Sequence, residues 1–452
     1  MGGSGSASPR GSRRRGARAA AVRVVERTLA TLAPAEGLLG REGAPLDERD
    51  RRLLAELVYG VLRWHARLGH VIALAAGRPL EAIDRELLPV LEVAVFQLLW
   101  LDRVPAHAAV AEAVDEARHR RGAGAAGFVN AVLRRVAAAP EPDAWPVEER
   151  DPARALAITF SHPVALVERW LDRFGREATE RALASDNGPR PVHLLAFSDR
   201  GGPAALVAAL AAEQVTARES PFSPLGVVVE SGRPFASAAF ARGDAYAQDL
   251  ASQAAALVPE PAPGESVLDA AAAPGGKGIA ILARQPSARP VFADLAPARV
   301  GRLAANLRRL GRHAPVVVAD AATPPWRVRF ERVILDAPCS GTGTLRRHPE
   351  LRWRFRPAEL ERLAAGALLL LRSLAGCVAP GGRLVHVTCS IEAEENEGVA
   401  ARFLEQESAF ARDPIEALAP SLAAGRSGAG SWRVLPESAH DGFSVAVFRR
   451  RR

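Results

Sequence analysis

Two short cysteine motifs contain residue types that could do covalent chemistry. Cys339 lies in Asp-Ala-Pro-Cys-Ser-Gly-Thr-Gly, residues 336–343, and Cys389 lies in Val-Thr-Cys-Ser, residues 387–390. Upstream, residues 269–277 read Asp-Ala-Ala-Ala-Ala-Pro-Gly-Gly-Lys, whose glycines let a backbone turn closely around a nucleotide-like cofactor. A cysteine thiolate is a strong nucleophile. The combination is suited to carbon methylation of a pyrimidine ring through a thiolate adduct.

Carbon 5 of cytosine is a poor nucleophile, which decides the side chains that such a reaction needs. A thiolate that adds to C6 converts the ring into an enamine, and the enamine can attack an electrophilic methyl group. An acid near N3 must then stabilise the adduct, and a base must remove the C5 proton. Cys339, Cys389 and Asp336 supply one attacking thiolate, one further thiol and one carboxyl. A free cysteine is more often a small core residue, and we prefer that interpretation for Cys377, which follows an apolar run.

The half of the chain that holds these motifs alternates predicted strands and helices. Apolar strands joined by helices indicate a mostly parallel sheet covered on both faces, with its binding site at the carboxyl ends of the strands. The predicted strands are residues 266–270, 291–295, 316–320, 332–336 and 383–388, with helices over 299–310 and 357–374. Residues 431–435 and 443–448 are expected to add antiparallel strands at the sheet edge. The residues at or just after strand ends are Asp269, Asp294, Asp320, Asp336 and Cys389.

Two of these acids suit contacts with a nucleoside. Asp294 ends the strand after the glycine turn, the usual place for a carboxylate that accepts ribose hydroxyls. Asp320 suits an exocyclic amine of adenine. The alternative is a plain strand-to-helix turn with nothing bound, since the motif is not a P-loop. Lys277 is the only lysine in an arginine-rich chain, which favours a turn that accepts only the compact ammonium group.

The first third of the chain has a helical pattern. Apolar residues recur at intervals of three and four over residues 22–32 and 53–62, and further apolar helical runs cover 87–101, 106–117 and 126–136. We expect a multidomain chain: a disordered basic tail over 1–17, an all-helical bundle over 18–140, a small α/β module over 150–240 and the α/β domain over 243–452. Within the small module, residues 163–174 are predicted as helix, and 191–197 and 225–230 as strands.

Basic residues follow the first cysteine motif closely. Arg346, Arg347 and His348 come just after its last glycine, and Arg352 and Trp353 come soon afterwards. Arginines interleaved with an aromatic ring suit a phosphate backbone and a stacked base, and the alternative is an ordinary charged loop. The net charge of +8 also fits a polyanionic partner.

Composition indicates a reduced compartment. Three cysteines in 452 residues give no disulfide framework, and no Cys/His cluster has zinc spacing. Arginines interrupt the apolar residues near the N-terminus, and the apolar stretch 364–371 is too short to span a bilayer. We therefore expect a cytoplasmic protein with no metal site and no membrane partner.

The motifs together resemble one family, the bacterial 16S ribosomal RNA cytosine-5 methyltransferases of the RsmB (Fmu/Sun) type. In that family a NusB-like helical domain precedes a Sun-type methyltransferase domain. The likeness rests on residues 336–343, 346–350 and 388–390, on Glu392, Glu394, Glu395 and Asn396, and on 246–253 and 441–443. In the helical part it rests on residues 59–63, 96–99 and 128–135.

This resemblance implies a Rossmann-like class I methyltransferase domain, with S-adenosylmethionine as methyl donor and a 16S rRNA base unstacked into the pocket. It implies that Cys389 is the nucleophile at C6, that Cys339 helps release the product, and that Asp336 contacts N3 and the cofactor. The implied cofactor-binding residues are Ala271, Ala272, Ala273, Pro274, Gly275, Gly276, Lys277, Asp294, Asp320 and Asp336.

Two departures from the family pattern and two other hypotheses remain. The family commonly has cysteine at Ala271, and Arg and Asn where this chain has Leu195 and Phe197. The second departure bears on how the middle module positions RNA. One alternative is the same chemistry on tRNA or another RNA, against which the helical N-terminal domain argues. The other is a non-catalytic RNA-binding assembly factor, against which the intact cysteine pair argues. A monomer that acts on unassembled or partly assembled small subunit is the default expectation.

Overall fold

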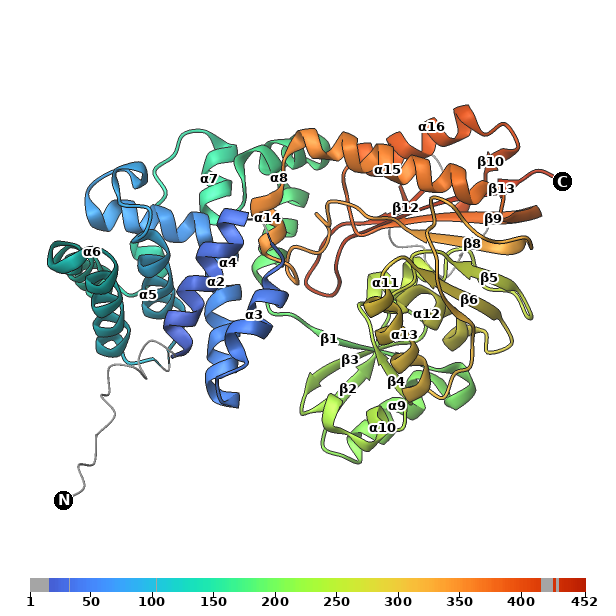
Figure 1. The fold of residues 1–452 in the computed structure, drawn as a ribbon, viewed down its shortest axis with the longest axis horizontal. Helices are drawn as coiled ribbons and strands as arrows, with labels where there is room; N and C mark the ends of the chain where they lie inside the picture. Colours follow the sequence, from blue (N-terminus) through green and yellow to red (C-terminus); the bar gives the residue numbers. More distant parts are fainter. Residues whose placement is uncertain (1–15, 32, 103, 416–425, 428–430) are drawn as a thin grey trace, which may run out of the picture. The chain divides into compact units, whose positions relative to one another are not determined.

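Two compact units make up the chain. The computed structural model describes residues 16–31, 33–102, 104–415, 426–427 and 431–452 (Figure 1). Unit 1 comprises Met1–Asn187 and His348–Phe355, and unit 2 comprises Gly188–Arg347 and Arg356–Arg452. Most of the predicted tail, residues 1–15, lies outside the described residues. The predicted small module, residues 150–240, is therefore divided between the two units: its part up to Asn187 belongs to unit 1, and the rest belongs to unit 2.

Unit 1 is helical, as the sequence predicts. Its main helices are α2 (Ala17–Thr31), α3 (Ala35–Gly43), α4 (Glu48–Ala76), α5 (Leu88–Trp100), α6 (Ala106–Ala137), α7 (Pro152–Thr159) and α8 (Val164–Asn187). Asp47 caps α4 by accepting a hydrogen bond from the backbone N–H of Asp50, and Gly77 ends the helix in the left-handed conformation. Helix α5 is buried along almost its whole length and packs against α2, α4 and α6. It is therefore the central helix of this core.

Helix α6 consists of two helical stretches that meet at a kink. The sequence predicts separate helical runs over residues 106–117 and 126–136, and the span Ala106–Ala137 is interrupted between them at Gly122. Gly122 has φ 82° and ψ −168°, which is not a helical conformation. Glycine adopts this backbone conformation at little cost. The two predicted runs are therefore confirmed, and the chain changes direction at the glycine between them.

A short segment from the second half of the chain folds as part of unit 1. Helix α14 (Glu350–Arg354) lies in the segment His348–Phe355. Arg352 is fully buried and donates hydrogen bonds to four oxygens, the backbone carbonyls of Arg63, Ser161 and Asp186 and the side chain of Asn187, at 2.8–3.1 Å. The indole N–H of Trp353 donates to the Leu62 carbonyl at 2.6 Å. These contacts give Arg352 and Trp353 a structural role inside unit 1, and the expected contact with RNA stays a prediction.

Unit 2 contains a large mixed sheet with a parallel centre. Strands β5 (Ser266–Asp269), β6 (Arg289–Asp294), β7 (Val316–Val318), β8 (Phe330–Asp336) and β9 (Val378–Thr388) run parallel in the order β9-β8-β5-β6-β7. The antiparallel addition predicted at the edge is also present. Strand β13 (Phe443–Arg450) pairs with β9, and β12 (Ser431–Val434) pairs with β13. Two shorter strands, β10 (Phe410–Arg412) and β11 (Arg426–Ser427), pair with β13 and β12.

Two strand boundaries differ from the prediction. Strand β9 begins at Val378, five residues before the predicted start, because Val378 pairs with Phe330 ahead of a register shift. The Pro-Gly-Gly run at 380–382 lies in this shift, and Gly381 has a φ of 75°. Strand β7 ends at Val318, so Asp320 lies two residues beyond it.

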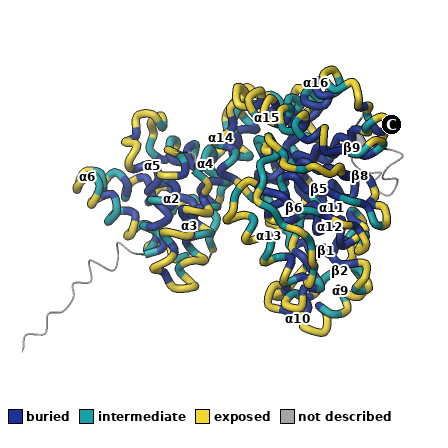
Figure 2. Tube along the Cα trace, turned by 45° about the vertical axis from the view of Figure 1, so that its right-hand side comes forward, coloured by how far each residue is buried: buried dark blue, intermediate teal, exposed yellow. Residues whose placement is uncertain are grey.

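Alternate residues of the central strands face two helical layers. Leu268, Leu335 and Leu384 pack on one face with α15 (Pro357–Ala375) and α16 (Val399–Gln406). Val267 and Ile334 pack on the other face with α11 (Leu250–Ala256) and α12 (Gly276–Arg284), and α13 (Pro297–Arg309) packs beside α12. This is the two-residue period of a strand buried on both faces. Figure 1 shows α15 and α16 over one face of the sheet and α11 and α12 over the other, and Figure 2 shows the central strands mostly in the colour of buried residues.

A second, smaller sheet completes unit 2. Its antiparallel strands β1 (Val192–Ala196), β2 (Thr216–Glu219), β3 (Gly226–Ser231) and β4 (Ala245–Ala247) have the order β2-β3-β1-β4, with α9 (Gly202–Ala211) and α10 (Ala238–Ala241) beside them. Leu195 and Phe197 are buried in one cluster with side chains of α12 and α13. Both side chains therefore contribute to the packing of the small sheet against these helices. Among the described helices, none is both long and apolar enough to cross a membrane.

The buried guanidinium of Arg352 predicts a large stability effect. Arg352→Ala removes a charged donor and leaves several buried carbonyl groups without a partner, so unit 1 should lose about 3 kcal/mol of unfolding free energy. Arg354→Ala, on the exposed side of the same helix, should change it by less than about 0.5 kcal/mol. Urea unfolding followed by circular dichroism measures both variants, and equal midpoints would contradict the prediction.

Candidate active site

The structure brings the two motif cysteines together. Cys339 follows β8 and Cys389 follows β9, and these strands pair in parallel up to Asp336 and Val387. Their carboxyl ends therefore meet at one edge of the sheet. The two sulfur atoms lie 3.4 Å apart, and both residues are half-buried free thiols.

Backbone contacts between three loops fix this spacing. The N–H of Gly343 donates to the Cys389 carbonyl at 2.9 Å, and the N–H of Gly442 donates to the Gly343 carbonyl at 2.7 Å. A side chain at Gly343 would place its Cβ 2.3 Å from the Gly442 oxygen and 2.9 Å from the Cys389 oxygen. Only glycine fits at this crossing. The close packing of these loops therefore explains why the first cysteine motif ends in glycine.

The neighbouring sulfur changes the acidity of Cys339. A hydrogen bond with Cys389, followed by burial, holds the pKa of the Cys339 thiol well above its usual range. The negative charge of Glu395 acts in the same direction. This environment therefore favours the protonated thiol form of Cys339.

Lys277 lies beside the cysteine loops and pairs with Asp336. Its ammonium nitrogen is 2.9 Å from the Asp336 carboxylate and donates to the Ser252 hydroxyl at 3.1 Å. The ring of Phe443 lies below the ammonium group, 4.9 Å from its centroid. The lysine side chain is only 4% exposed, so the site holds a desolvated cation against a half-buried carboxylate.

The glycine turn leads directly from β5 into α12. Gly275 has a φ of 118° and precedes the first residue of the helix. Its Cβ would lie within 2.7 Å of the Ile279 and Leu303 side chains, so this position also requires glycine. Gly276 faces the side-chain amide of Gln248, which donates to the Gly276 carbonyl at 3.0 Å. Residues 271–277 thus form a tight loop at the carboxyl end of the sheet, in which Gly275 and Gly276 carry no side chain.

The two predicted nucleoside acids also lie at this edge. Asp294 ends β6, and its buried carboxylate accepts the N–H groups of Ala273 and Ala296, both at 3.1 Å. Arg299 approaches the same carboxylate at 3.3 Å. Asp320 is half-buried and accepts the N–H of Ala322 at 2.8 Å. The sequence-predicted acids are therefore gathered on neighbouring strand ends.

Asp269 has the most unusual environment of these acids. Its carboxyl group is fully buried, and one oxygen accepts the Gly278 N–H at 2.9 Å. The other oxygen has no hydrogen-bond partner among the described residues. Burial raises the pKa of Asp269 to about 7, and the charge of Asp336 acts in the same direction.

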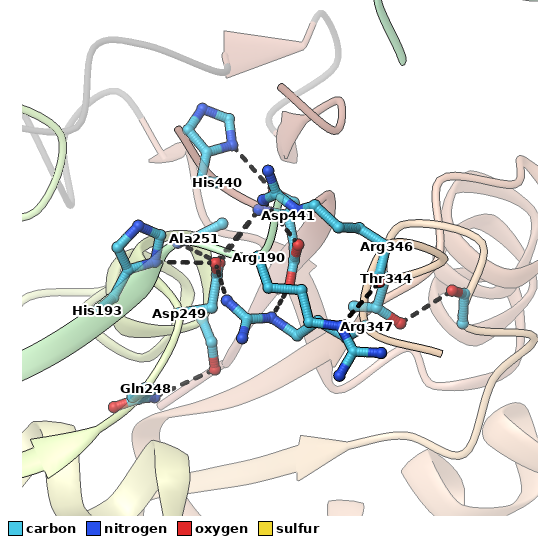
Figure 3. A network of polar contacts seen from close by, with 12 residues as sticks. Arg190, His193, Gln248, Asp249, Ala251, Thr344, Arg346, Arg347, His440 and Asp441 are labelled. Atoms are coloured by element: carbon cyan, nitrogen blue, oxygen red, sulfur yellow. Dashed lines mark hydrogen bonds and ion pairs between the residues drawn. The ribbon is translucent and has the colours of Figure 1, made fainter. Parts of the chain in front are cut away.

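Arg346 and Arg347 lie in a polar network with two buried acids (Figure 3). Arg346 is 2% exposed, pairs with Asp441 at 3.0 Å and donates to the carbonyls of Glu437 and Ser438. Arg347 pairs with Asp441 and, at 2.9 Å, with Asp249. The expected role of both arginines in RNA binding stays a prediction, but Arg346 is fully engaged inside unit 2.

The Asp249 carboxylate links this network to the small sheet. His193 of β1 approaches it at 3.2 Å, and Asp249 also caps α11 through the Ala251 N–H. Hydrogen bonding with His193 and the charge of Arg347 hold the pKa of Asp249 well below its usual range, despite its burial. Sequence reasoning missed this network, since Asp249 and His193 are 56 residues apart. His348 lies in the segment that belongs to unit 1 and is exposed.

The fold and site define a methyltransferase of the Rossmann-like type, preceded by a NusB-like helical region. The family model described as 16S rRNA methyltransferase RsmB/F matches residues 256–449, and the model described as NusB family matches residues 15–138. The chain belongs to the RsmB/F family of methyltransferases.

Individual relatives agree with this assignment. The chain is 32% identical to a probable ribosomal RNA small subunit methyltransferase B of Bacillus subtilis, over 90% of this chain and 92% of the relative. It is 34% identical to ribosomal RNA small subunit methyltransferase B of Pseudomonas putida, over 95% and 97% of the two chains. The crystal structure of PH0851 superposes with a TM-score of 0.75 at 25% identity, covering 95% of this chain and 98% of the other. The fold predicted from the sequence is confirmed.

The buried carboxyl of Asp269 predicts a pH-dependent difference in stability. Its folded-state pKa of about 7 lies above the unfolded value near 4. Its stabilising contribution is therefore complete below about pH 4 and is lost as pH rises through about 7. Asp269→Asn is neutral throughout, so its Tm relative to the wild type should rise by several °C from pH 5 to pH 8 and then level off. Calorimetry at several pH values measures this difference, and parallel curves would contradict it.

Proposed function

We propose that this chain transfers a methyl group to C5 of a specific cytosine in 16S ribosomal RNA, with S-adenosylmethionine as the donor. The observation that carries the proposal is the pair of cysteine sulfurs 3.4 Å apart at the ends of two adjacent strands. The Lys277–Asp336 pair flanks that site. The rRNA substrate is supported by the names of the relatives in Bacillus subtilis and Pseudomonas putida.

The residues at the sheet edge fit such a donor. Residues 271–277 form a tight loop in which a side chain at Gly275 would clash with Ile279 and Leu303. Asp294 and Asp320 present acceptors on the next two strand ends, which suit ribose hydroxyls and the adenine amine. Asp269 adds a buried oxygen without a partner among the described residues. The donor supplies an electrophilic methyl group when bound.

We assign Cys389 as the nucleophile that adds to C6 of the base. The raised pKa of Cys339 supports this choice, because a protonated Cys339 can donate to a Cys389 thiolate at 3.4 Å. Such a hydrogen bond stabilises the thiolate before it reacts. The bond that forms joins the Cys389 sulfur to C6, and the electron pair that it displaces makes C5 nucleophilic.

Asp336 and Cys339 then handle protons. Asp336 would face N3 of the bound base. N3 takes up a proton from solvent as Cys389 adds, and the Asp336 carboxylate, which Lys277 holds in place at 2.9 Å, stabilises the protonated nitrogen of the adduct. After methylation, the C5 proton must leave so that the C6–sulfur bond can break. We assign this step to Cys339, which loses its proton to solvent once Cys389 is bound to the ring and no longer carries the negative charge of the pair. The Cys339 thiolate then takes the C5 proton, N3 releases its proton to solvent, and the elimination returns the Cys389 thiolate.

Recognition of RNA involves the helical region and the basic residues after the first cysteine motif. A net charge of +8 favours a polyanionic partner. Of the three residues predicted to bind RNA, Arg347 and His348 retain exposed side-chain surface, 29% and 55% respectively. The proposed substrate is unassembled or partly assembled small-subunit RNA, which places the reaction in the cytoplasm, and a monomer suffices for it.

Cys389→Ala should abolish methyl transfer. The alanine side chain cannot form the C6 adduct. Turnover of 16S rRNA with labelled S-adenosylmethionine should therefore fall by at least about 10³-fold, the order of magnitude expected when a covalent nucleophile is lost. Donor binding, measured by calorimetry, should stay within about threefold. Cys377→Ala, at a buried cysteine away from this edge, is the control and should keep activity. Bisulfite sequencing of the product identifies the cytosine, and full turnover by Cys389→Ala would disprove the assignment.

Cys339→Ser should accumulate a covalent enzyme–RNA species. A serine hydroxyl is a much weaker base than a thiolate, so addition by Cys389 continues while release is slowed. With donor and 16S rRNA present, a slowly migrating band should appear on a denaturing gel. The band should be absent in the double variant Cys339→Ser/Cys389→Ala. If Cys339→Ser alone gives no band while adduct-dependent methylation persists, Cys339 has no role in release.

A further inference from the structure

One buried carboxylate connects the loops that hold both cysteines. Glu395 is 1% exposed and lies in the π-helical turn η5 (Glu394–Gly398). It accepts the N–H of Ser340 at 2.7 Å and the Ser340 hydroxyl at 2.5 Å. It also accepts the hydroxyl of Ser390. Ser340 directly follows Cys339, and Ser390 directly follows Cys389.

The serine hydroxyls are tied into a wider set of contacts. They lie 3.2 Å from each other, and Ser390 Oγ also accepts the N–H of Glu392 at 3.1 Å. Asn396, next to Glu395, donates to the Ser390 carbonyl at 3.0 Å and accepts the Thr388 hydroxyl at 2.6 Å. The segment on both sides of Cys389 is therefore bound to one π-helical turn. Such turns interrupt helices and often occur at functional sites.

All three donors to the Glu395 carboxylate are neutral groups. Burial raises its pKa, and the hydrogen bonds from Ser340 and Ser390 act in the opposite direction. The titratable groups that face it are Glu392 on the preceding loop and the thiol of Cys339. In its ionised form, the Glu395 carboxylate raises the pKa of the Cys339 thiol, in addition to the larger effects of the Cys389 hydrogen bond and of burial.

We propose that Glu395 is the positioning residue of the cysteine pair. Its carboxylate clamps Ser340 and Ser390 and, together with the backbone contacts at Gly343, holds the spacing of the two sulfur atoms. This proposal rests on the proposed function only where it concerns catalysis. The spacing of the two sulfur atoms and the protonation of the thiols can be measured without RNA. Glu395 touches neither sulfur in the described contacts and is not itself a catalytic residue.

The test compares three variants of the full chain. Glu395→Ala removes the clamp and the charge. Glu395→Gln removes the charge but keeps one acceptor oxygen for the Ser340 N–H, and its amide N–H groups can donate to the two serine hydroxyls. Glu331→Gln is the matched control. Glu331 accepts the N–H and hydroxyl of one serine, Ser266, at 2.7 and 2.9 Å, but it lies at the opposite end of β8 from Asp336.

Two measurements separate a positioning role from a merely structural one. The first is the rate of iodoacetamide modification of Cys339 against pH, followed by peptide mass spectrometry without RNA or donor. In Glu395→Gln the pH midpoint of Cys339 should move to lower pH, because the nearby negative charge is gone. The second is methyl transfer: kcat should fall at least tenfold in Glu395→Ala, less in Glu395→Gln, with KM for RNA within about threefold.

The outcomes distinguish this proposal from the proposed function. An unchanged Cys339 midpoint in Glu395→Gln, with kcat equal to that of Glu331→Gln, overturns the positioning role. If the wild-type chain transfers no methyl group, the proposed function fails, and the alkylation midpoint still tests the clamp. If Glu395→Ala does not fold, Glu395→Gln alone decides, since its amide can still hydrogen-bond to both serines.

Discussion

The parallel pairing of β8 with β9 is the constraint on which the site depends. Asp336 and Val387 are register partners, so the residues that follow each strand leave the sheet at the same point. Two cysteines that are 50 residues apart in the chain then lie with their sulfurs 3.4 Å apart. A shift of the register by one residue would turn alternate side chains to the opposite helical layer and would separate the sulfurs. The apolar packing on both faces of the sheet therefore protects the chemistry as well as the fold.

Polar contacts then hold the loops that the sheet brings together. Glycine at 343 permits the loops to cross, and the Glu395 carboxylate holds the serine next to each cysteine. A second buried carboxylate, Asp249, joins Arg347 to the small sheet. Buried charges of this kind are costly unless they are fully paired. Their presence on both sides of the cysteine loops indicates that precise geometry here matters more than maximal stability.

Periodicity and strand-end residues predicted much of this arrangement. The central strands, the helical first third and the convergence of Asp294, Asp336 and Cys389 on one edge all follow from apolar runs and from the rule that sites lie at strand ends. Boundaries were predicted less well at the start of β9, where Val378 pairs with Phe330 ahead of a register shift. The role of Arg346 could not be read either, because its acid partner Asp441 is 95 residues away and leaves no local pattern. Long-range pairing of charges is decided by the fold.

The placement of α14 has a consequence for how the molecule can be divided. The chain enters unit 2 after Asn187, returns to unit 1 for His348–Phe355, and then re-enters unit 2. No single cut separates the halves, since a catalytic half expressed alone would carry Arg352 and Trp353 without the carbonyl oxygens that they bind. The helical region is thus not an appended module that evolution or an engineer could exchange freely. Its sequence and that of the segment just beyond the first cysteine motif must change together.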